Sequence, residues 1–231
     1  MEKTSGVKLL GSHPSPFVNR VVLALTIKSI HYELVEVNPH KDGEILAKYN
    51  PVHKKIPVLV HGDKPISESL IIVRYIDEVW NEGPSILPTD PYDRAMALFW
   101  AAYIDDKWFP LFKQLQGSQE GDSRKETLDK ITEGLVFLEK AFKDSSKGKP
   151  FFGGETVGYL DIAMGSVVGW IKVAETLIGQ KIFDDEKAPL LVGWIDKIYS
   201  ENSVKDAMLN PQTLLEVFKK LQAMKTEAAA T

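Results

Sequence analysis

The segment Ser15-Pro16-Phe17-Val18-Asn19-Arg20 lies between a short apolar run, Val7 to Leu10, and a stretch in which apolar residues recur at helical spacing. Serine directly before proline is a typical helix start, because the hydroxyl caps free amides and proline is tolerated at the first helical position. The free amides and the positive end of the helix dipole also stabilise an anion, including a thiolate. The segment therefore has two interpretations. Either Ser15 only caps a helix, or the helix start is a site that stabilises an anion, with the Ser15 hydroxyl as a hydrogen-bond donor.

The composition is that of an ordinary globular protein, with 44% hydrophobic and 26% charged residues in a chain of 231. The net charge of −4 and the lack of a basic stripe argue against a nucleic-acid partner. No apolar run approaches the roughly 20 residues of a membrane span. The first six residues lack the features of a secretory signal or a transit peptide. We therefore expect a cytosolic protein without a membrane span.

Cysteine is absent from the sequence. This excludes disulfides, thiolate zinc sites and cysteine nucleophiles. The five histidines, at positions 13, 31, 40, 53 and 61, do not have metal-ligand spacing on one helix. We therefore expect no metal site.

Two regions of the chain differ in their periodicity. Up to residue 82, strand and helix patterns alternate in the order β-α-β-α-β-β-α, with the second strand expected around Ile30 to Leu34. Residues 83–93 contain three prolines and a glycine, which is typical of a linker. Beyond it the pattern is helical, starting with a long helix from Arg94 to about Gln116. We therefore predict an α/β domain (1–82), a linker (83–93) and an all-helical domain (94–231).

A second segment of interest is Asn50-Pro-Val-His-Lys-Lys-Ile-Pro-Val-Leu59. Proline cannot donate to a strand ladder, so Pro57 belongs at the start or edge of a strand. A cis Ile56–Pro57 bond would leave the backbone of Ile56 to pair with an extended, peptide-like ligand. Cis bonds are only about 5–6% of X–Pro bonds, so the residues alone favour a trans proline that opens a strand.

A third segment, Ile66-Ser67-Glu68-Ser69-Leu70, precedes another helical pattern. Ser69 could cap this helix, and Glu68 would be stabilised by its positive end. Alternatively, Glu68 would accept a hydrogen bond from a ligand ammonium while Ser69 holds a ligand carboxylate. Taken alone, the segment favours capping.

Together these three segments resemble those of soluble glutathione transferases, and specifically the plant tau class. Arg94-Ala-Met-Ala-Leu-Phe-Trp100 and the segment from Phe152 to Ala163 resemble the helical domain of that class. The resemblance covers nearly the whole chain. It implies a thioredoxin-like N-terminal domain, an all-helical C-terminal domain and a homodimer. It also implies glutathione as co-substrate, with no cofactor.

The resemblance implies that Ser15 donates a hydrogen bond to the glutathione sulfur. A free thiol has a pKa of about 8.5 and the thiolate is the nucleophile, so such a donor increases reactivity at neutral pH. The residues implied to hold the glycyl and cysteinyl parts of glutathione are Lys55, Ile56 and a cis Pro57. Those implied to hold the γ-glutamyl end are Glu68 and Ser69.

Further positions near this site are open to alternative interpretations or depart from the family pattern. Arg20, just over one helical turn beyond Ser15, either tunes the local field or is a solvated surface residue. His13 stands where tau members commonly have tryptophan; it either alters the site electrostatically or fills space in the loop. Asp42 stands where a basic residue often faces the glycyl carboxylate, and we expect Lys41 to substitute through a small loop shift.

The electrophile pocket is expected between the two domains, where ligand sites are common. The resemblance implies that Phe17 faces this pocket. Phe109, Lys113 and Gln116 share one helix face by their spacing, and Trp170 and Phe218 would complete the wall. For each aromatic residue, simple core packing is the alternative.

Asp161 in Gly158-Tyr-Leu-Asp161 is interpreted as a folding element. At the third helical position its carboxylate can accept from backbone amides, as one half of a capping box.

The function implied is conjugation of glutathione to hydrophobic electrophiles, with reduction of organic hydroperoxides as a further possibility, as in plant detoxification and stress response. Serine rather than cysteine at position 15 argues against glutaredoxin-like chemistry. A non-catalytic carrier of hydrophobic small molecules on the same fold is the alternative. A purely structural module is disfavoured by the intact set of Ser15, Lys55, Glu68 and Ser69.

Overall fold

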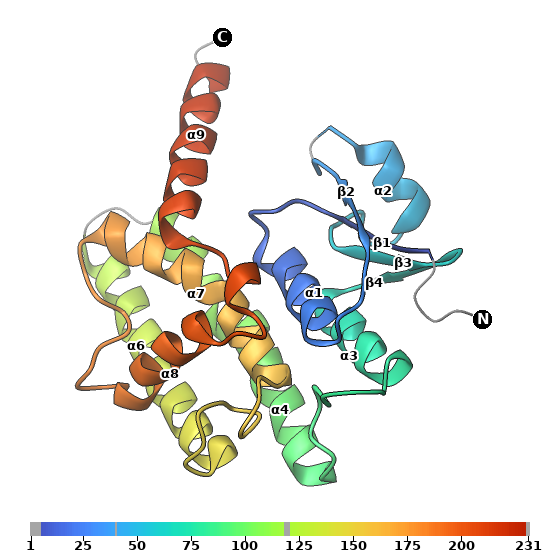
Figure 1. The fold of residues 1–231 in the computed structure, drawn as a ribbon. Coiled ribbons are helices and arrows are strands. Elements are labelled where there is room, and N and C mark those ends of the chain that lie inside the picture. Colours follow the sequence, from blue (N-terminus) through green and yellow to red (C-terminus); the bar gives the residue numbers. More distant parts are fainter. Residues whose placement is uncertain (1–5, 40, 118–120, 230–231) are drawn as a thin grey trace.

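The computed structural model describes residues 6–39, 41–117 and 121–229, which form a small α/β part followed by a helical part (Figure 1). The order of elements in the first part is the predicted β-α-β-α-β-β-α. These elements are β1 (Val7–Gly11), α1 (Pro16–Ile27), β2 (Glu33–Glu36), α2 (Gly43–Tyr49), β3 (Val58–His61), β4 (Lys64–Ser67) and α3 (Ser69–Val79).

The four strands form one mixed sheet in the order β2-β1-β3-β4. β1 runs parallel to β2 and antiparallel to β3. Helices α1 and α3 cover the face toward the helical part, and α2 covers the other (Figure 1). Successive side chains of β1 point to opposite faces of the sheet. Leu9 packs in the cluster with α1 and α3, and Leu10 packs in the cluster with Leu46 of α2.

The second strand begins later than the alternation of Ile30, Tyr32 and Leu34 predicts. Ser29 has a positive φ of 53°, and the amide of Ile30 still bonds to the carbonyl of Leu25 at the end of α1. These residues therefore close the helix, and pairing with β1 starts at Glu33.

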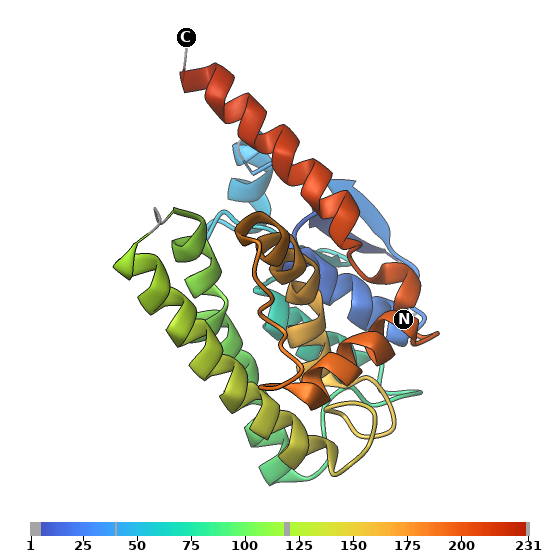
Figure 2. The same ribbon diagram turned by 90° about the vertical axis from the view of Figure 1, so that its left-hand side faces the viewer.

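The helical part contains α4 (Pro91–Tyr103), the π-helix η1 (Ile104–Trp108), α5 (Pro110–Gly117), α6 (Asp122–Ser146), α7 (Tyr159–Ile178), α8 (Pro189–Ser200), the 3₁₀ turn η2 (Lys205–Ala207) and α9 (Pro211–Ala229). Helix α7 is buried along most of its length, whereas α9 extends beyond the body of the molecule (Figures 1 and 2). No helix in the described ranges is long and apolar enough to cross a bilayer.

The long helix predicted from Arg94 to Gln116 is divided by η1. The amide of Phe109 bonds to the carbonyl of Ile104, five residues earlier, at 2.8 Å. Pro110 follows directly; it has no amide to donate and its ring crowds the carbonyl four residues before it. Pro110 thus accounts for the π-helical turn η1 that precedes it.

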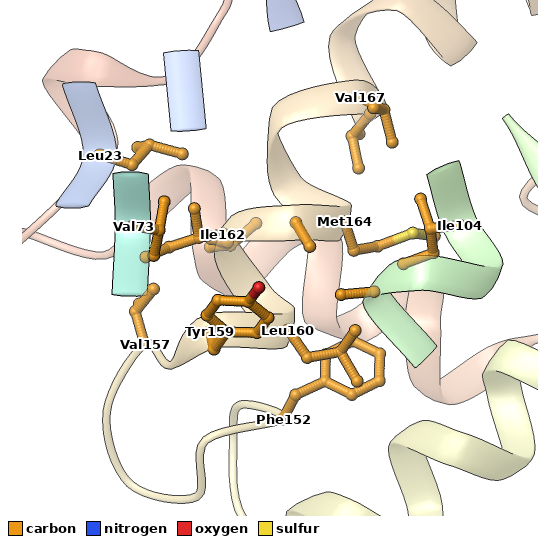
Figure 3. Packing of buried hydrophobic residues seen from close by; sticks show 14 of the residues in the cluster. Leu23, Val73, Ile104, Phe152, Val157, Tyr159, Leu160, Ile162, Met164 and Val167 are labelled. Carbon is orange, nitrogen blue, oxygen red and sulfur yellow. The ribbon is translucent and has the colours of Figure 1, made fainter. Parts of the chain in front are cut away.

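The cores of the two parts are continuous. Leu23 of α1 and Val73 of α3 lie beside Ile162 of α7 in one buried cluster that reaches Ile104 (Figure 3). The connection between α3 and α4 is also held: Asp77 accepts from the amides of residues 86 and 87, at 2.9 Å each, and pairs with buried Lys28 at 2.7 Å.

Asp161 is a folding element, as predicted. It is fully buried at the start of α7 and accepts from the amides of Phe152, Gly153 and Gly158 and from the indole of Trp194, at 2.7–2.9 Å. Burial raises the pKa of Asp161 to about 6, and these four donors oppose that shift. All four donors point at the two carboxyl oxygens, an arrangement that favours the ionised form.

Candidate active site

Ser15 is the N-cap of α1. Its Oγ accepts a hydrogen bond from the amide of Val18 at 3.3 Å, and Pro16 occupies the first helical position. The side chain is only partly buried. A hydroxyl that accepts still has its own O–H to donate, so capping and donation to a ligand are compatible.

The loop from Asn50 to Pro57 is organised by the buried side chain of Asn50. Its Nδ2 donates to the carbonyl of Lys55 at 2.9 Å, and its Oδ1 accepts from the amide of His53 at 3.1 Å. The Ile56–Pro57 bond is cis, in agreement with the family resemblance and not with the trans proline favoured by the residues alone. The side chain of Lys55 is exposed beside it.

Glu68 is the residue before α3 and has a positive φ of 71°. Such a conformation is uncommon for a residue other than glycine and occurs preferentially at functional sites. Its exposed carboxylate lies 3.8 Å from Nε2 of His53. The loop that contains Lys55 and the start of α3 are therefore neighbours, as a shared ligand would require.

Ser69, the first residue of α3, is buried, and its Oγ accepts from Nη1 of Arg20 at 3.3 Å. Ser69 therefore keeps its O–H for donation, like Ser15. Because Arg20 belongs to α1, this bond ties together the two helix starts that carry Ser15 and Ser69.

The solvated surface alternative for Arg20 is wrong, because its side chain is 0% exposed. It forms a bidentate pair with Asp105 of η1 at 2.6 and 2.7 Å. It also donates to Oγ of Ser166 and to the carbonyl of Ala163 on α7, at 3.1 Å each. Sequence spacing could not reveal this, since Asp105 and Ser166 lie 85 and 146 positions away.

The two departures from the family pattern have separate environments. Asp42 accepts from the amide of Asn38 at 2.7 Å and so closes the turn before α2, in which Lys41 is exposed. His13 is exposed at the rim of a cavity that it shares with Tyr32 and Leu34.

The predicted pocket aromatics form two groups. Phe17 and Phe109 meet edge to face with centroids 6.4 Å apart, and the guanidinium of Arg20 lies 5.2 Å from the ring of Phe17. This group joins the α/β part to the helical part. Lys113 and Gln116 are exposed on α5 beyond Phe109.

The second group contains Trp170 and Phe218, which pack in one small cluster with Leu209 and Leu214. The indole of Trp170 donates to the carbonyl of Pro14 at 2.8 Å. Trp170 thus supports the loop that presents Ser15, a role that the sequence does not indicate.

The described residues contain no group of three or more His, Cys, Asp or Glu side chains that could hold a metal ion.

Comparison with known proteins identifies the family. Residues 5–78 match the glutathione S-transferase N-terminal domain and residues 104–181 a glutathione S-transferase C-terminal domain. Glutathione S-transferase U17 of Arabidopsis thaliana is 50% identical over 219 residues, which are 94% of this chain and 96% of that protein. The chain is a tau-class glutathione transferase.

Solved structures agree with this assignment. The tau-class transferase from mango (Mangifera indica) has a TM-score of 0.91 at 50% identity, with 94% of this chain and 99% of that one covered. Rice GST1 in complex with glutathione has a TM-score of 0.84 at 30% identity, with 94% and 98% covered. The transferase described here therefore has the thioredoxin-like and all-helical domains of its class, and its activity is glutathione conjugation.

Proposed function

We propose that this transferase is of the serine type, with Ser15 donating a hydrogen bond to the glutathione thiolate. The observation that carries this proposal is the position of the Ser15 hydroxyl at the N-cap of α1, partly exposed and with its O–H left to donate. The helix amides and dipole add to the stabilisation of the anion. A lower thiol pKa then yields more nucleophile at neutral pH.

The remainder of glutathione is proposed to lie between the loop at Lys55 and the start of α3. Glu68 would accept from the ammonium of the γ-glutamyl end, and the Ser69 hydroxyl would donate to its carboxylate. Lys55 and the backbone of Ile56, beside Pro57, would hold the glycyl and cysteinyl parts; Lys41 would face the glycyl carboxylate. The 3.8 Å approach of His53 to Glu68 supports this grouping, because it brings the two segments together.

Hydrophobic electrophiles are proposed to bind where Phe17 meets Phe109, with Lys113, Gln116, Trp170 and Phe218 around them. The same thiolate would reduce organic hydroperoxides. We further propose that the protein is cytosolic, with residues 1–82 and 94–231 as the two domains and residues 83–93 as the linker.

The test of Ser15 is the pH profile of glutathione conjugation to a chloro-nitroaromatic compound. In Ser15→Ala the apparent thiol pKa should rise toward the free value of about 8.5, and kcat/KM at pH 6.5 should fall about tenfold or more. Asp90→Ala is the matched control: Asp90 caps α4 by accepting from two amides, so its loss weakens a helix start of the same kind. An unchanged profile in Ser15→Ala would contradict the proposal.

The carrier alternative predicts a different result. A protein that binds glutathione and a hydrophobic ligand but turns over no electrophile or peroxide in such assays would be a carrier, and Ser15→Ala would then change neither affinity.

A homodimer is proposed on the basis of an exposed apolar surface. Phe99 on α4 is 57% exposed, and Val136 and Phe137 on α6 are 47% and 46% exposed. Apolar side chains gathered on neighbouring helices are typical of an interaction surface. A second copy of the chain is the occupant that we propose for it.

A further inference from the structure

A cavity of about 670 Å³ lies at the end of the helical part away from the start of α1, toward the bottom of Figure 1. It is bounded by residues 85–89, which connect the two parts, and by α4, the end of α6, the loop 149–155 and the start of α7. Its described lining contains none of the residues proposed for glutathione, for the electrophile or for the dimer surface. The volume is in the range of cavities that hold small organic molecules.

The floor of this cavity is fixed by hydrogen bonds within the protein. Asp77 holds the amides of Ile86 and Leu87, and the carbonyl of Ile86 accepts from the amide of Tyr159 at 2.9 Å. Asp161 holds two amides of the loop that forms a further part of the lining. Binding in the cavity therefore does not require these segments to become ordered first.

One wall of the cavity is a face of α4 that suits a flat ring. Tyr92, Met96 and Trp100 line it and follow one another at four-residue spacing, which places them on one side of the helix. Tyr92 is 72% exposed, and the other two are half-buried. Aromatic rings and thioether sulfur both make favourable contacts with an aromatic ligand. We therefore expect the ring of a ligand at this wall.

Two of the three lysines in the described lining are neutralised by the protein. Lys147 pairs with Asp93 at 2.8 Å, and Lys149 pairs with Glu155 at 2.6 Å. A ligand with only a negative charge would compete with these carboxylates, and a ligand with only a positive charge would compete with these lysines. The two pairs therefore favour neither sign of net charge.

The other charged groups of the described lining are Lys140 and Asp144, which are exposed and one turn apart on α6. Neither forms an ion pair with another described residue. A lysine four positions before an acidic residue is in the less favourable order for pairing within a helix. The carbonyl end of α6, which follows Asp144, adds to the attraction of this carboxylate for a cation. The cavity therefore offers one acceptor for an ammonium and one donor for a carboxylate.

We propose that this cavity is a binding site for an aromatic α-amino acid in its zwitterionic form. The ring lies against Tyr92, Met96 and Trp100, the ammonium donates to Asp144, and the carboxylate accepts from Lys140. Binding is non-covalent and does not depend on glutathione.

Titration calorimetry of the wild-type chain with four indole probes tests the ligand class. L-Tryptophan should bind about threefold or more tightly than tryptamine, which lacks the carboxylate, and than indole-3-propionate, which lacks the ammonium. Apolar burial alone predicts that the neutral probe 3-methylindole binds at least as tightly as L-tryptophan. That order, or equal affinity of L-tryptophan and either analogue with a single charge, would overturn the proposal.

Two variants that each remove one charge assign the two ends of the ligand. Lys140→Met should weaken L-tryptophan and indole-3-propionate about threefold or more and leave tryptamine unchanged. Asp144→Asn should weaken L-tryptophan and tryptamine by a similar factor and leave indole-3-propionate unchanged.

The matched controls are Lys143→Met and Asp129→Asn, which remove exposed charges of α6 outside the described lining. Neither control should change the affinity for any of the four probes. Unchanged L-tryptophan affinity in either cavity variant, or an equal loss in its control, would overturn the assignment.

All titrations are carried out with saturating S-hexylglutathione, because Glu68 and Ser69 of the proposed glutathione site would also hold an amino-acid group. Binding that depends on Lys140 and Asp144 should be present with and without this probe. Loss of L-tryptophan binding in its presence would place the amino acid in the glutathione site and overturn the proposal. The variants of α6 remain informative even if the residues proposed for glutathione are wrong.

Discussion

At the scale of single residues, several side chains form a hydrogen bond within the protein and still have a donor or acceptor available for a ligand. The hydroxyls of Ser15 and Ser69 each accept one bond from the protein, from Val18 and Arg20 respectively, and keep a donor. Glu68 is held in a positive-φ conformation that no capping function requires, since its side chain forms no cap hydrogen bond. These local arrangements suit a polar ligand that bridges the two helix starts.

For Glu68→Gln we expect glutathione affinity to fall about tenfold, because a charge-assisted hydrogen bond is worth about 1.5–3 kcal/mol. Titration calorimetry measures the dissociation constant. Glu78→Gln is the control, since Glu78 is an exposed carboxylate of the same helix that pairs only loosely with Arg74, at 4.0 Å. Unchanged affinity in Glu68→Gln would remove Glu68 from the proposed site.

Arg20→Met should lower the free energy of unfolding by about 3 kcal/mol, because Asp105 loses its buried partner. It should also raise KM for glutathione, since Ser69 loses the bond that positions it. Arg74→Met removes an exposed arginine and should change stability by no more than about 0.5 kcal/mol. Urea denaturation compares the two; equal effects would show that the Arg20 network is not structural.

At the scale of secondary-structure elements, helix boundaries account for the shape of the site. Pro110 converts one predicted helix into α4, η1 and α5, and η1 contains Asp105, the partner of Arg20. The start of α7 is likewise fixed by Asp161, whose four donors come from three separate segments. The contribution of such a carboxylate to the free energy of unfolding should increase with its burial.

Asp161→Asn should lower the free energy of unfolding by about 3–5 kcal/mol, because the new amide group turns donors toward donors in a fully buried position. Glu139→Gln offers a graded comparison: Glu139 accepts from the amides of Leu190 and Leu191 at the start of α8, at 2.9 Å each, in a half-exposed position. There we expect a loss of about 1 kcal/mol. Chemical denaturation at neutral pH measures both, and a reversed ranking would contradict this explanation.

At the scale of the whole molecule, the two domains share one core, and the proposed site lies across their junction. Leu23 and Val73 pack against α7 (Figure 3), while Arg20 and Trp170 connect the start of α1 to the helical part through hydrogen bonds. A change in domain packing would therefore displace Ser15. The exposed apolar residues of α4 and α6 form the surface to which we propose that a second copy binds.

Light scattering should show twice the mass of one chain for the wild-type protein. Phe99→Asp should shift it toward a single chain, because the substitution places a charge on the proposed interface. Leu177→Asp introduces the same charge at another exposed residue, 43% accessible, and should leave the dimer intact. A wild-type protein with the mass of one chain would refute the homodimer.

The order of elements in the first domain, the helix start at Ser15 and the cap at Asp161 were determined by the sequence itself, because periodicity and capping are local properties of a few consecutive residues. The extent of β2, the burial of Arg20 and the contact of Trp170 with Pro14 were decided only by the tertiary structure. Arg20 and Ser166 are 146 positions apart, and no local pattern encodes which distant groups surround a side chain. The role that we propose for Ser15 stays a prediction, whereas the contacts that hold its loop and helix depend on how the two domains pack.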